Sequence, residues 1–152
     1  MIIIKSDSDI RLMRKAGSIT AAALNKAGSV IKAGMSTKEL DLIIEDCIRS
    51  KGAVPSFKGY GGFPASACIS INNVVIHGIP RNDIIICDGD IVSVDVGAYI
   101  NGFHGDSAYT FMVGNVKDNA KLLCDTTKES LYKAQAVMKA GVRLGDIGNA
   151  VA

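Results

Sequence analysis

The sequence predicts an α/β (α+β) fold in which a unit of helices followed by antiparallel strands occurs twice, the second time incompletely. Helical hydrophobic stripes fill residues 8–51, and short strand-like segments continue to about residue 113. An Asn-Gly hairpin lies among these strands. A shift of 107 residues superposes the end of a later helix on the end of the first one. Together these observations predict a duplicated helix-strand unit.

The first 51 residues predict two amphipathic helices. Ser6 opens a capping sequence, and an apolar helical stripe then runs as far as Gly34. Either Ser36 or Thr37 caps the second helix, which ends near Gly52. The two helices should therefore pack their apolar stripes against a common core.

A loop rich in Gly, Pro and aromatic residues is expected over 53–67, before the strands. Strand-like segments follow at 68–71, 74–79 and 84–87, each short and rich in β-branched residues. A third helix is expected over about 117–140. The strands between the helices would supply the sheet of the first unit.

A two-residue turn fixes the hairpin that follows these segments. Asn101 and Gly102 tolerate the positive φ that a type I′ turn requires at both central positions. Ile100 should then pair with Phe103. All other pairs of the hairpin follow by counting back from this one.

This register brings two carboxylates together. It sets Asp95 opposite Ala108 and Gly97 opposite Asp106, so the two acids are diagonal neighbours on one face. The other face is apolar and consists of Val92, Val94, Val96, Ala98, Ile100, Phe103, Tyr109, Phe111 and Val113. Such a carboxylate pair can share a proton, face open water or bind a cation. A cation is the favoured interpretation, and an ordinary solvent-facing sheet with two unrelated acids is the alternative.

The internal repeat predicts two copies of the helix-strand unit, of which the second is incomplete. Lys32-Ala33-Gly34 aligns with Lys139-Ala140-Gly141, and Leu24 aligns with Leu131. The first copy then spans about 8–113, and the second begins near 115 and stops inside its second helix. If the second copy has the same length as the first, the parent protein should contain a further ~100 residues. Chance similarity of two glycine-capped helices is the alternative.

Length and composition favour one cytoplasmic domain. The 152 residues are 48% hydrophobic, and 17 basic against 15 acidic side chains leave a formal net charge of +2. This balance indicates neither nucleic-acid binding nor membrane binding, and no apolar stretch reaches the length of a membrane span. The four cysteines, which should be buried and reduced because they form no C-x-x-C pair, are Cys47, Cys68, Cys87 and Cys124.

Several motifs together resemble one enzyme family. They are Gly34–Leu40, Cys68–Asn72, Asn72–Pro80, Asp88–Asp95 and Gly102–Asp106. Nearly the whole chain resembles the N-terminal half of the type I methionine aminopeptidases. The resemblance implies the pita-bread fold of two pseudo-symmetric halves, with residues 1–152 forming the first half and the start of the second within one catalytic domain.

The resemblance also implies a dinuclear metal site. Asp95 would bind one divalent ion and Asp106 would bridge two, while a His and two Glu would come from the missing half. The ions could be Mn, Fe, Co or Zn, and the sequence does not choose among them. His77 would contact the scissile amide as a catalytic residue, although a lone His at the end of a strand is about as often structural.

The 53–67 loop and its flank would supply the substrate pocket. The resemblance implies that Tyr60, Phe63 and Cys68 line the pocket for the methionine side chain. The residues of the loop alone favour a plain surface loop packed by its own aromatic side chains. His104 shares the carboxylate face, where it could support the ligands without being one.

The expected activity is removal of the initiator methionine from the N-terminus of nascent polypeptides. A related prolidase or aminopeptidase P is the nearest alternative, and a catalytically silent pita-bread binding module is a second. The 152-residue chain alone should be inactive because it lacks most of the metal shell. Exposed apolar surface should make it self-associate or bind the missing C-terminal half.

Overall fold

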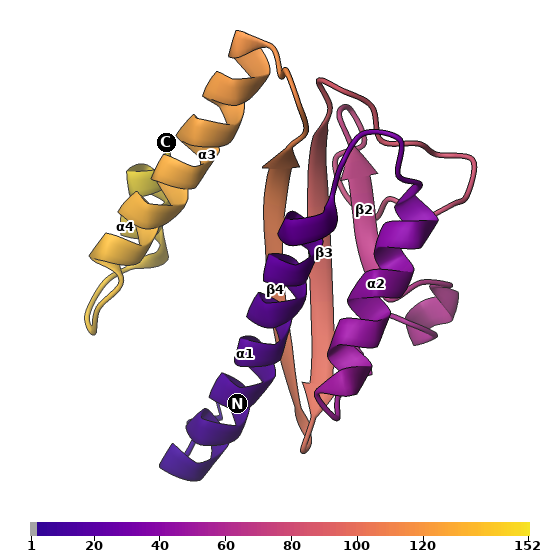
Figure 1. Ribbon diagram of the computed structural model, residues 1–152. Coiled ribbons are helices and arrows are strands. Elements are labelled where there is room, and N and C mark those ends of the chain that lie inside the picture. Colours follow the sequence, from indigo (N-terminus) through magenta and orange to yellow (C-terminus); the bar gives the residue numbers. More distant parts are fainter. Residues whose placement is uncertain (1–2) are drawn as a thin grey trace. The chain divides into compact units, whose positions relative to one another are not determined.

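A four-stranded antiparallel sheet with two helices on one face forms the first part of the computed structural model (Figure 1). The structure describes residues 3–152, which divide into one unit up to Asn115 and a second from Val116 to Ala152. In the first unit the elements are α1 (Asp7–Val30), α2 (Thr37–Ser50), β1 (Val54–Pro55), η1 (Tyr60–Gly62), β2 (Ala67–Ile71), β3 (Ile91–Ile100) and β4 (Phe103–Met112). The second unit consists of α3 (Asp118–Val137) and α4 (Leu144–Val151). The mixed α/β fold class is confirmed.

Strand β3 is the centre of the sheet. β4 pairs with it along its whole length, from Ile91 opposite Met112 to Ile100 opposite Phe103. β1 and β2 pair with other parts of β3, and since β4 occupies one edge they lie end to end along the other. The predicted hairpin register is confirmed, because the Asn-Gly turn and the apolar alternation specify the same pairing.

Helices α1 and α2 cover the apolar face of this sheet (Figure 1). Both are capped as the sequence predicts: Asp9 N–H donates to Ser6 Oγ over 3.2 Å, and Glu39 N–H donates to Ser36 Oγ over 3.1 Å. Ser36, not Thr37, is therefore the cap of α2. The fully buried side chains that form the core between helices and sheet include Ala16, Ala23, Leu40, Ile44, Ile48, Val92, Val94 and Val96.

Two of the expected strands are absent from the described residues, and two helices end early. The segment 84–87 makes only an isolated bridge, Ser36 to Ile85, and 74–79 contains no strand. Their β-branched side chains predicted strands, but positive φ at Asn72 and His77 interrupts an extended chain. α1 ends at Val30 because the next residue, Ile31, has ψ 128°, and Gly34 N–H then donates to the carbonyl of Ile86 at 2.8 Å.

The expected buried cysteines are only partly found. All four thiols are free, as predicted, and Cys68 is buried. Cys87 is exposed, and Cys47 and Cys124 are half-buried. The general tendency of cysteine to be buried therefore fails to predict the exposure of Cys87, which lies in a loop outside the helices and strands of the described residues.

The second unit begins as the first does. α3 ends at Val137 and α4 begins at Leu144, positions that the 107-residue shift matches to Val30 and Thr37 at the corresponding boundaries of α1 and α2. The helix α3 is therefore shorter than the expected 117–140 segment. Duplication of the unit stays a prediction, and the boundaries agree with it.

Candidate metal centre and substrate pocket

Two neighbouring strands position the carboxylate pair. Asp95 of β3 lies opposite Ala108, and Asp106 of β4 lies opposite Gly97, so the acids are diagonal neighbours as predicted. Asp95 is half-buried and Asp106 is exposed. The helices cover the other face, which leaves this face to the two acids.

The electrostatics of Asp95 favour a cation. Burial raises the pKa of its carboxyl, the nearby negative charge of Asp106 raises it further, and His77 opposes the shift. Asp95 Oδ1 is buried and has no hydrogen-bond partner among the described residues. A buried acceptor without a donor, next to a second carboxylate, fits a ligand of a divalent metal ion.

These two acids are the candidate ligands that the structure brings together. Among residues 3–152 there is no group of three or more His, Cys, Asp or Glu side chains that could hold a metal ion. The donor set offered by this face is thus a pair of carboxylates. Hard oxygen donors of this kind suit a divalent cation.

A backbone clamp positions His77 beside the pair. Ile69 N–H donates to the Gly78 carbonyl over 2.9 Å, and Gly78 N–H donates to Ser70 Oγ over 3.1 Å. His77 itself has φ 59°, a conformation that side chains other than Gly, Asn and Asp rarely adopt. His77 is also one of the residues that line a largely apolar cavity of about 370 Å³. Unusual backbone geometry held by neighbouring hydrogen bonds is typical of functional sites.

Cys68 lies directly opposite Asp95 in the β2–β3 ladder. Its side chain is buried, and burial followed by the charges of Asp95, Asp106 and Asp41 raises the pKa of the thiol to about 11. Cys68 is therefore a neutral thiol at physiological pH. It offers an apolar surface beside the carboxylates and does not act as an anionic nucleophile.

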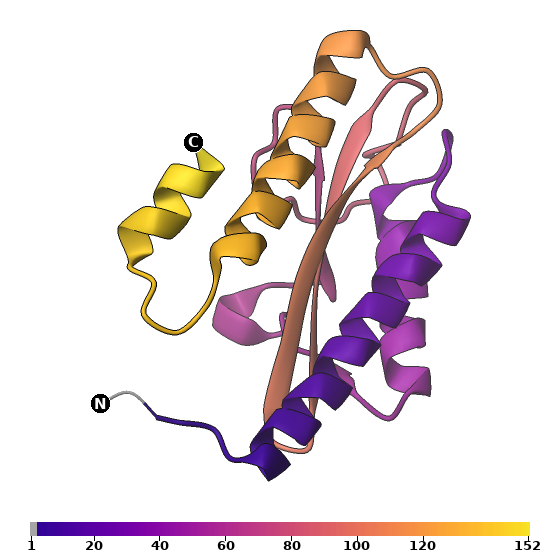
Figure 2. The ribbon, with the colours of Figure 1, turned by 90° about the vertical axis from the view of Figure 1, so that its left-hand side faces the viewer.

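The loop between β1 and β2 turns onto the carboxylate face. Ser56 N–H donates to the Gly97 carbonyl over 2.9 Å, and a Cβ at Gly97 would lie 2.6 Å from the Phe57 ring. Gly97 has the same orientation as Asp95, two residues away on β3. Figure 2 shows the short helical turn η1 on the side of the sheet away from α1 and α2.

The loop residues predicted for the pocket differ in their surroundings. Tyr60 is 82% exposed, and Phe63 is half-buried. The structure thus places their loop over the face that carries the two carboxylates, without enclosing the Tyr60 ring.

Sequence reasoning missed three residues that organise this region, Ser56, Asp41 and Glu45, and it placed His104 on the carboxylate face without identifying its partner. His104 Nδ1 lies 2.9 Å from Ser56 Oγ, which ties the end of the hairpin to the start of the loop. Asp41 and Glu45 of α2 contact the same loop from the other side. The only sign of their role in the sequence was that Asp41 and Glu45 lie four residues apart beside the apolar stripe of a helix. Acids in such positions are usually exposed to solvent.

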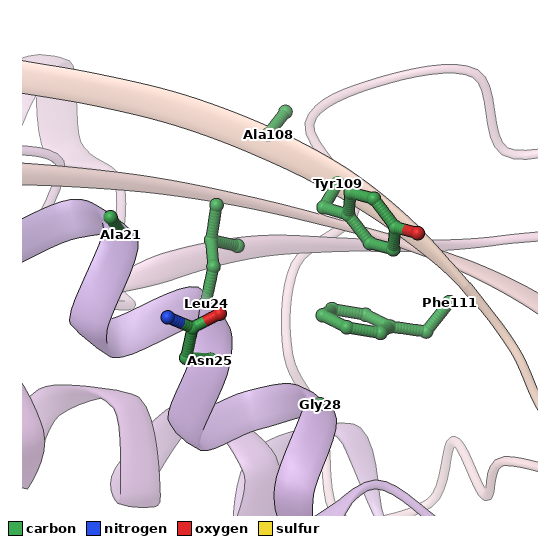
Figure 3. A pocket seen from close by; sticks show the side chains of 7 residues that line it. All are labelled: Ala21, Leu24, Asn25, Gly28, Ala108, Tyr109 and Phe111. Atoms are coloured by element: carbon green, nitrogen blue, oxygen red, sulfur yellow. The ribbon is translucent and has the colours of Figure 1, made fainter. Parts of the chain in front are cut away.

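A further groove lies elsewhere in the first unit. It runs between α1 and β4, has a volume of about 550 Å³ and contains none of the predicted site residues (Figure 3). The side chains that line it are Ala21, Leu24, Asn25, Gly28, Ala108, Tyr109 and Phe111. It is a largely apolar surface on the outer edge of the sheet.

The chain has many relatives among methionine aminopeptidases. Methionine aminopeptidase 1 of Bacillus subtilis is 49% identical over 151 residues, a match that covers 99% of this chain and 60% of the relative. Methionine aminopeptidase of Escherichia coli K12 is 45% identical over 151 residues, covering 99% of this chain and 57% of that protein. The chain thus spans about 60% of the length of these relatives.

Solved structures of methionine aminopeptidases and related peptidases are also similar to this chain. Methionine aminopeptidase from Thermotoga maritima superposes with a TM-score of 0.95 at 40% identity, covering 99% of this chain and 60% of the other. An Xaa-Pro dipeptidase from Bacillus anthracis reaches 0.85 at 27% identity, covering 97% of this chain and 40% of the other. The resemblance found in the motifs is confirmed. The family model described as metallopeptidase family M24 matches residues 11–152, and the chain belongs to that family.

Proposed function

We propose that the whole protein is a metalloaminopeptidase that removes the N-terminal methionine from nascent polypeptides in the cytoplasm. The observation that carries this proposal is the diagonal pair Asp95 and Asp106, with a buried, unpartnered Asp95 oxygen, in a chain 49% identical to a methionine aminopeptidase. Carboxylate pairs of this kind are ligands in two-metal hydrolases.

Asp95 and Asp106 would hold the divalent metal ions. When bound, such ions polarise the scissile carbonyl and lower the pKa of water to near neutrality. Without a cation, burial and the nearby charge of Asp106 raise the pKa of the Asp95 carboxyl. The same arrangement therefore has a strong preference for positive charge. Mn, Fe, Co and Zn are all compatible with these oxygen ligands.

His77 would orient the substrate. The Gly78 clamp holds the backbone next to His77 against β2, which fixes where its side chain leaves the chain. An imidazole N–H in that position can donate to the scissile amide and stabilise charge that develops there. Preorganisation of the donor avoids a reorganisation cost during the reaction.

Tyr60, Phe63 and Cys68 would form the pocket for the methionine side chain. The neutral Cys68 thiol and the aromatic rings match an unbranched thioether, which is apolar and polarizable. A pocket beside the carboxylates would place the first peptide bond of the substrate at the metal site.

The metal assignment is tested by substituting one ligand in the whole protein. Asp95→Asn should lower the bound metal, measured by mass spectrometry after dialysis, and reduce hydrolysis of Met-Ala-Ser by at least about 100-fold, since it removes a metal ligand. Asp46→Asn is the matched control because Asp46 is an exposed acid on α2. Unchanged metal stoichiometry and affinity in Asp95→Asn would contradict the assignment.

A proline-specific peptidase is the second candidate, favoured by the Xaa-Pro dipeptidase structure with TM-score 0.85. Its 27% identity is well below the 49% of the methionine aminopeptidase relative. Cleavage of Ala-Pro in preference to Met-Ala-Ser would favour this alternative. The 152-residue chain by itself is expected to cleave neither peptide.

A further inference from the structure

Asp41 is a buried acid of α2 that contacts the end of the β1–β2 loop. Its side chain is fully buried, and Oδ1 accepts hydrogen bonds from Ser66 N–H at 2.8 Å and Ala67 N–H at 3.0 Å. Oδ2 accepts from Lys38 Nζ at 2.8 Å. Two backbone donors on one carboxylate oxygen form a short, directional anchor. Asp41 therefore determines where the loop returns to the sheet.

Glu45, one helical turn later, contacts the start of the same loop. Its Oε2 accepts from Lys58 Nζ at 2.6 Å, and Oε1 accepts from Arg49 Nε at 2.8 Å. Burial acts to raise the pKa of Glu45, but the hydrogen bonds from Lys58 and Arg49 outweigh it and lower the pKa to about 2. Glu45 is thus ionised at physiological pH, which favours its ion pair with Lys58.

The segment between these anchors lies over the carboxylate face. We call residues 56–66 the β1–β2 loop, which packs on Gly97 through Phe57 and ends two residues before Cys68, the partner of Asp95. Within it, Gly59, Gly61 and Gly62 all have positive φ. A loop with three such glycines has many alternative conformations, so its observed shape depends on contacts at its ends.

We propose that Asp41 and Glu45 are positioning residues for substrate selectivity. By holding both ends of the β1–β2 loop, they determine the position of Tyr60 and Phe63 and hence the width of the pocket for the N-terminal side chain. The inference rests on the proposed aminopeptidase function. It extends that function because the two acids lie on a helix, away from the proposed metal ligands.

Charge and spacing support a rigid connection. Residues four apart on a helix lie on one face, so Asp41 and Glu45 present their carboxylates in one direction. Each is joined to a different end of the loop, at Ser66–Ala67 and at Lys58. A movement of either end therefore requires breaking a charge-assisted hydrogen bond.

Lys58 offers the mildest test because its side chain is 40% exposed and its loss leaves the core intact. In the whole protein, Lys58→Met should raise KM for Met-Ala-Ser about two- to five-fold with little change in kcat, as expected for loss of a partly exposed ion pair. The preference for Met-Ala-Ser over Leu-Ala-Ser should fall by a similar factor. Lys58→Arg should restore both values.

Lys51→Met is the matched control. Lys51 is an exposed lysine just after α2, and it forms no salt bridge within the described residues 3–152. Amide hydrogen exchange of residues 57–63 in the metal-free protein provides a second readout, independent of activity. Exchange should be faster in Lys58→Met and in Glu45→Gln than in the control.

The outcomes separate the two proposals. If KM, selectivity and loop exchange in Lys58→Met equal those of Lys51→Met, the positioning role is overturned. If loop exchange rises but selectivity does not change, the acids hold the loop without setting specificity, and the inference is again overturned. If the unsubstituted protein cleaves no methionyl peptide, the proposed function fails and selectivity for methionine fails with it, whatever the loop exchange shows.

Discussion

At the scale of single residues, the site depends on atoms whose partners come from distant parts of the chain. Asp95 and Asp106 could be predicted as neighbours from the sequence because a local turn sets their register. The position of the His77 backbone could not be predicted, since it depends on the contact of Gly78 with β2. Close backbone contacts of this kind have no signature in composition or periodicity.

Gly78 allows a direct test of that contact. A Cβ on Gly78 would overlap the carbonyl oxygen of Ile69, so Gly78→Ala should destabilise the protein by about 1–3 kcal/mol through overpacking. Urea denaturation measures the change. Gly17→Ala is the control, because a Cβ there has no neighbour within 4 Å and alanine favours a helix. Equal stability of the two variants would show that Gly78 is not a required contact.

At the scale of elements, local chemistry explains what was predictable. The Asn-Gly turn specifies the β3–β4 hairpin, and Ser36 specifies the start of α2. The segment 74–87 was wrongly expected to contain strands, because β-branched residues alone do not supply a partner strand. The β1–β2 loop was recognised as a loop, but its shape depends on α2, whose acids looked like ordinary surface residues.

The connection between α2 and the loop should be visible in the pH dependence of stability. The pKa of Glu45 is lowered from 4.5 to about 2 in the folded protein, so its ionised form stabilises the fold above pH 4.5. This contribution should be lost as the pH falls from 4.5 towards 2. Glu45→Gln should therefore destabilise the protein at pH 7 and much less at pH 2.5, measured by urea denaturation. A constant difference across this range would contradict the ion-pair explanation.

At the scale of the whole molecule, the helix boundaries match at a separation of 107 residues. Gly34 has φ 87° and Gly141, its counterpart, has φ 89°, so the connections after α1 and α3 also share a left-handed glycine. The matching helix boundaries could be predicted from the sequence because the glycines and apolar stripes that mark them are local. The metal donors that a second copy would supply could not be predicted from the residues of this chain, because those donors are not among them.

The apolar groove between α1 and β4 leads to a prediction about association. We expect the 152-residue chain to self-associate through this groove, because large apolar side chains line it. Ala21→Glu, which places a charge in the groove, should shift the chain towards monomer in sedimentation velocity. Ser18→Glu, an exposed position of α1 outside the lining, is the control. A monomeric unsubstituted chain at high concentration would contradict the prediction.

The arrangement of β1 and β2 along one edge of β3 has a further consequence. The two strands behave as one interrupted strand, and the β1–β2 loop is the insertion at the interruption. The carboxylates, in contrast, belong to the hairpin on the opposite side of β3 and to β3 itself. The loop can thus lengthen, shorten or change composition without altering the sheet register that holds the acids. The two carboxylates and the β1–β2 loop therefore belong to different elements of the sheet, so under the proposed function a change in the loop could alter substrate preference while the carboxylates keep their places.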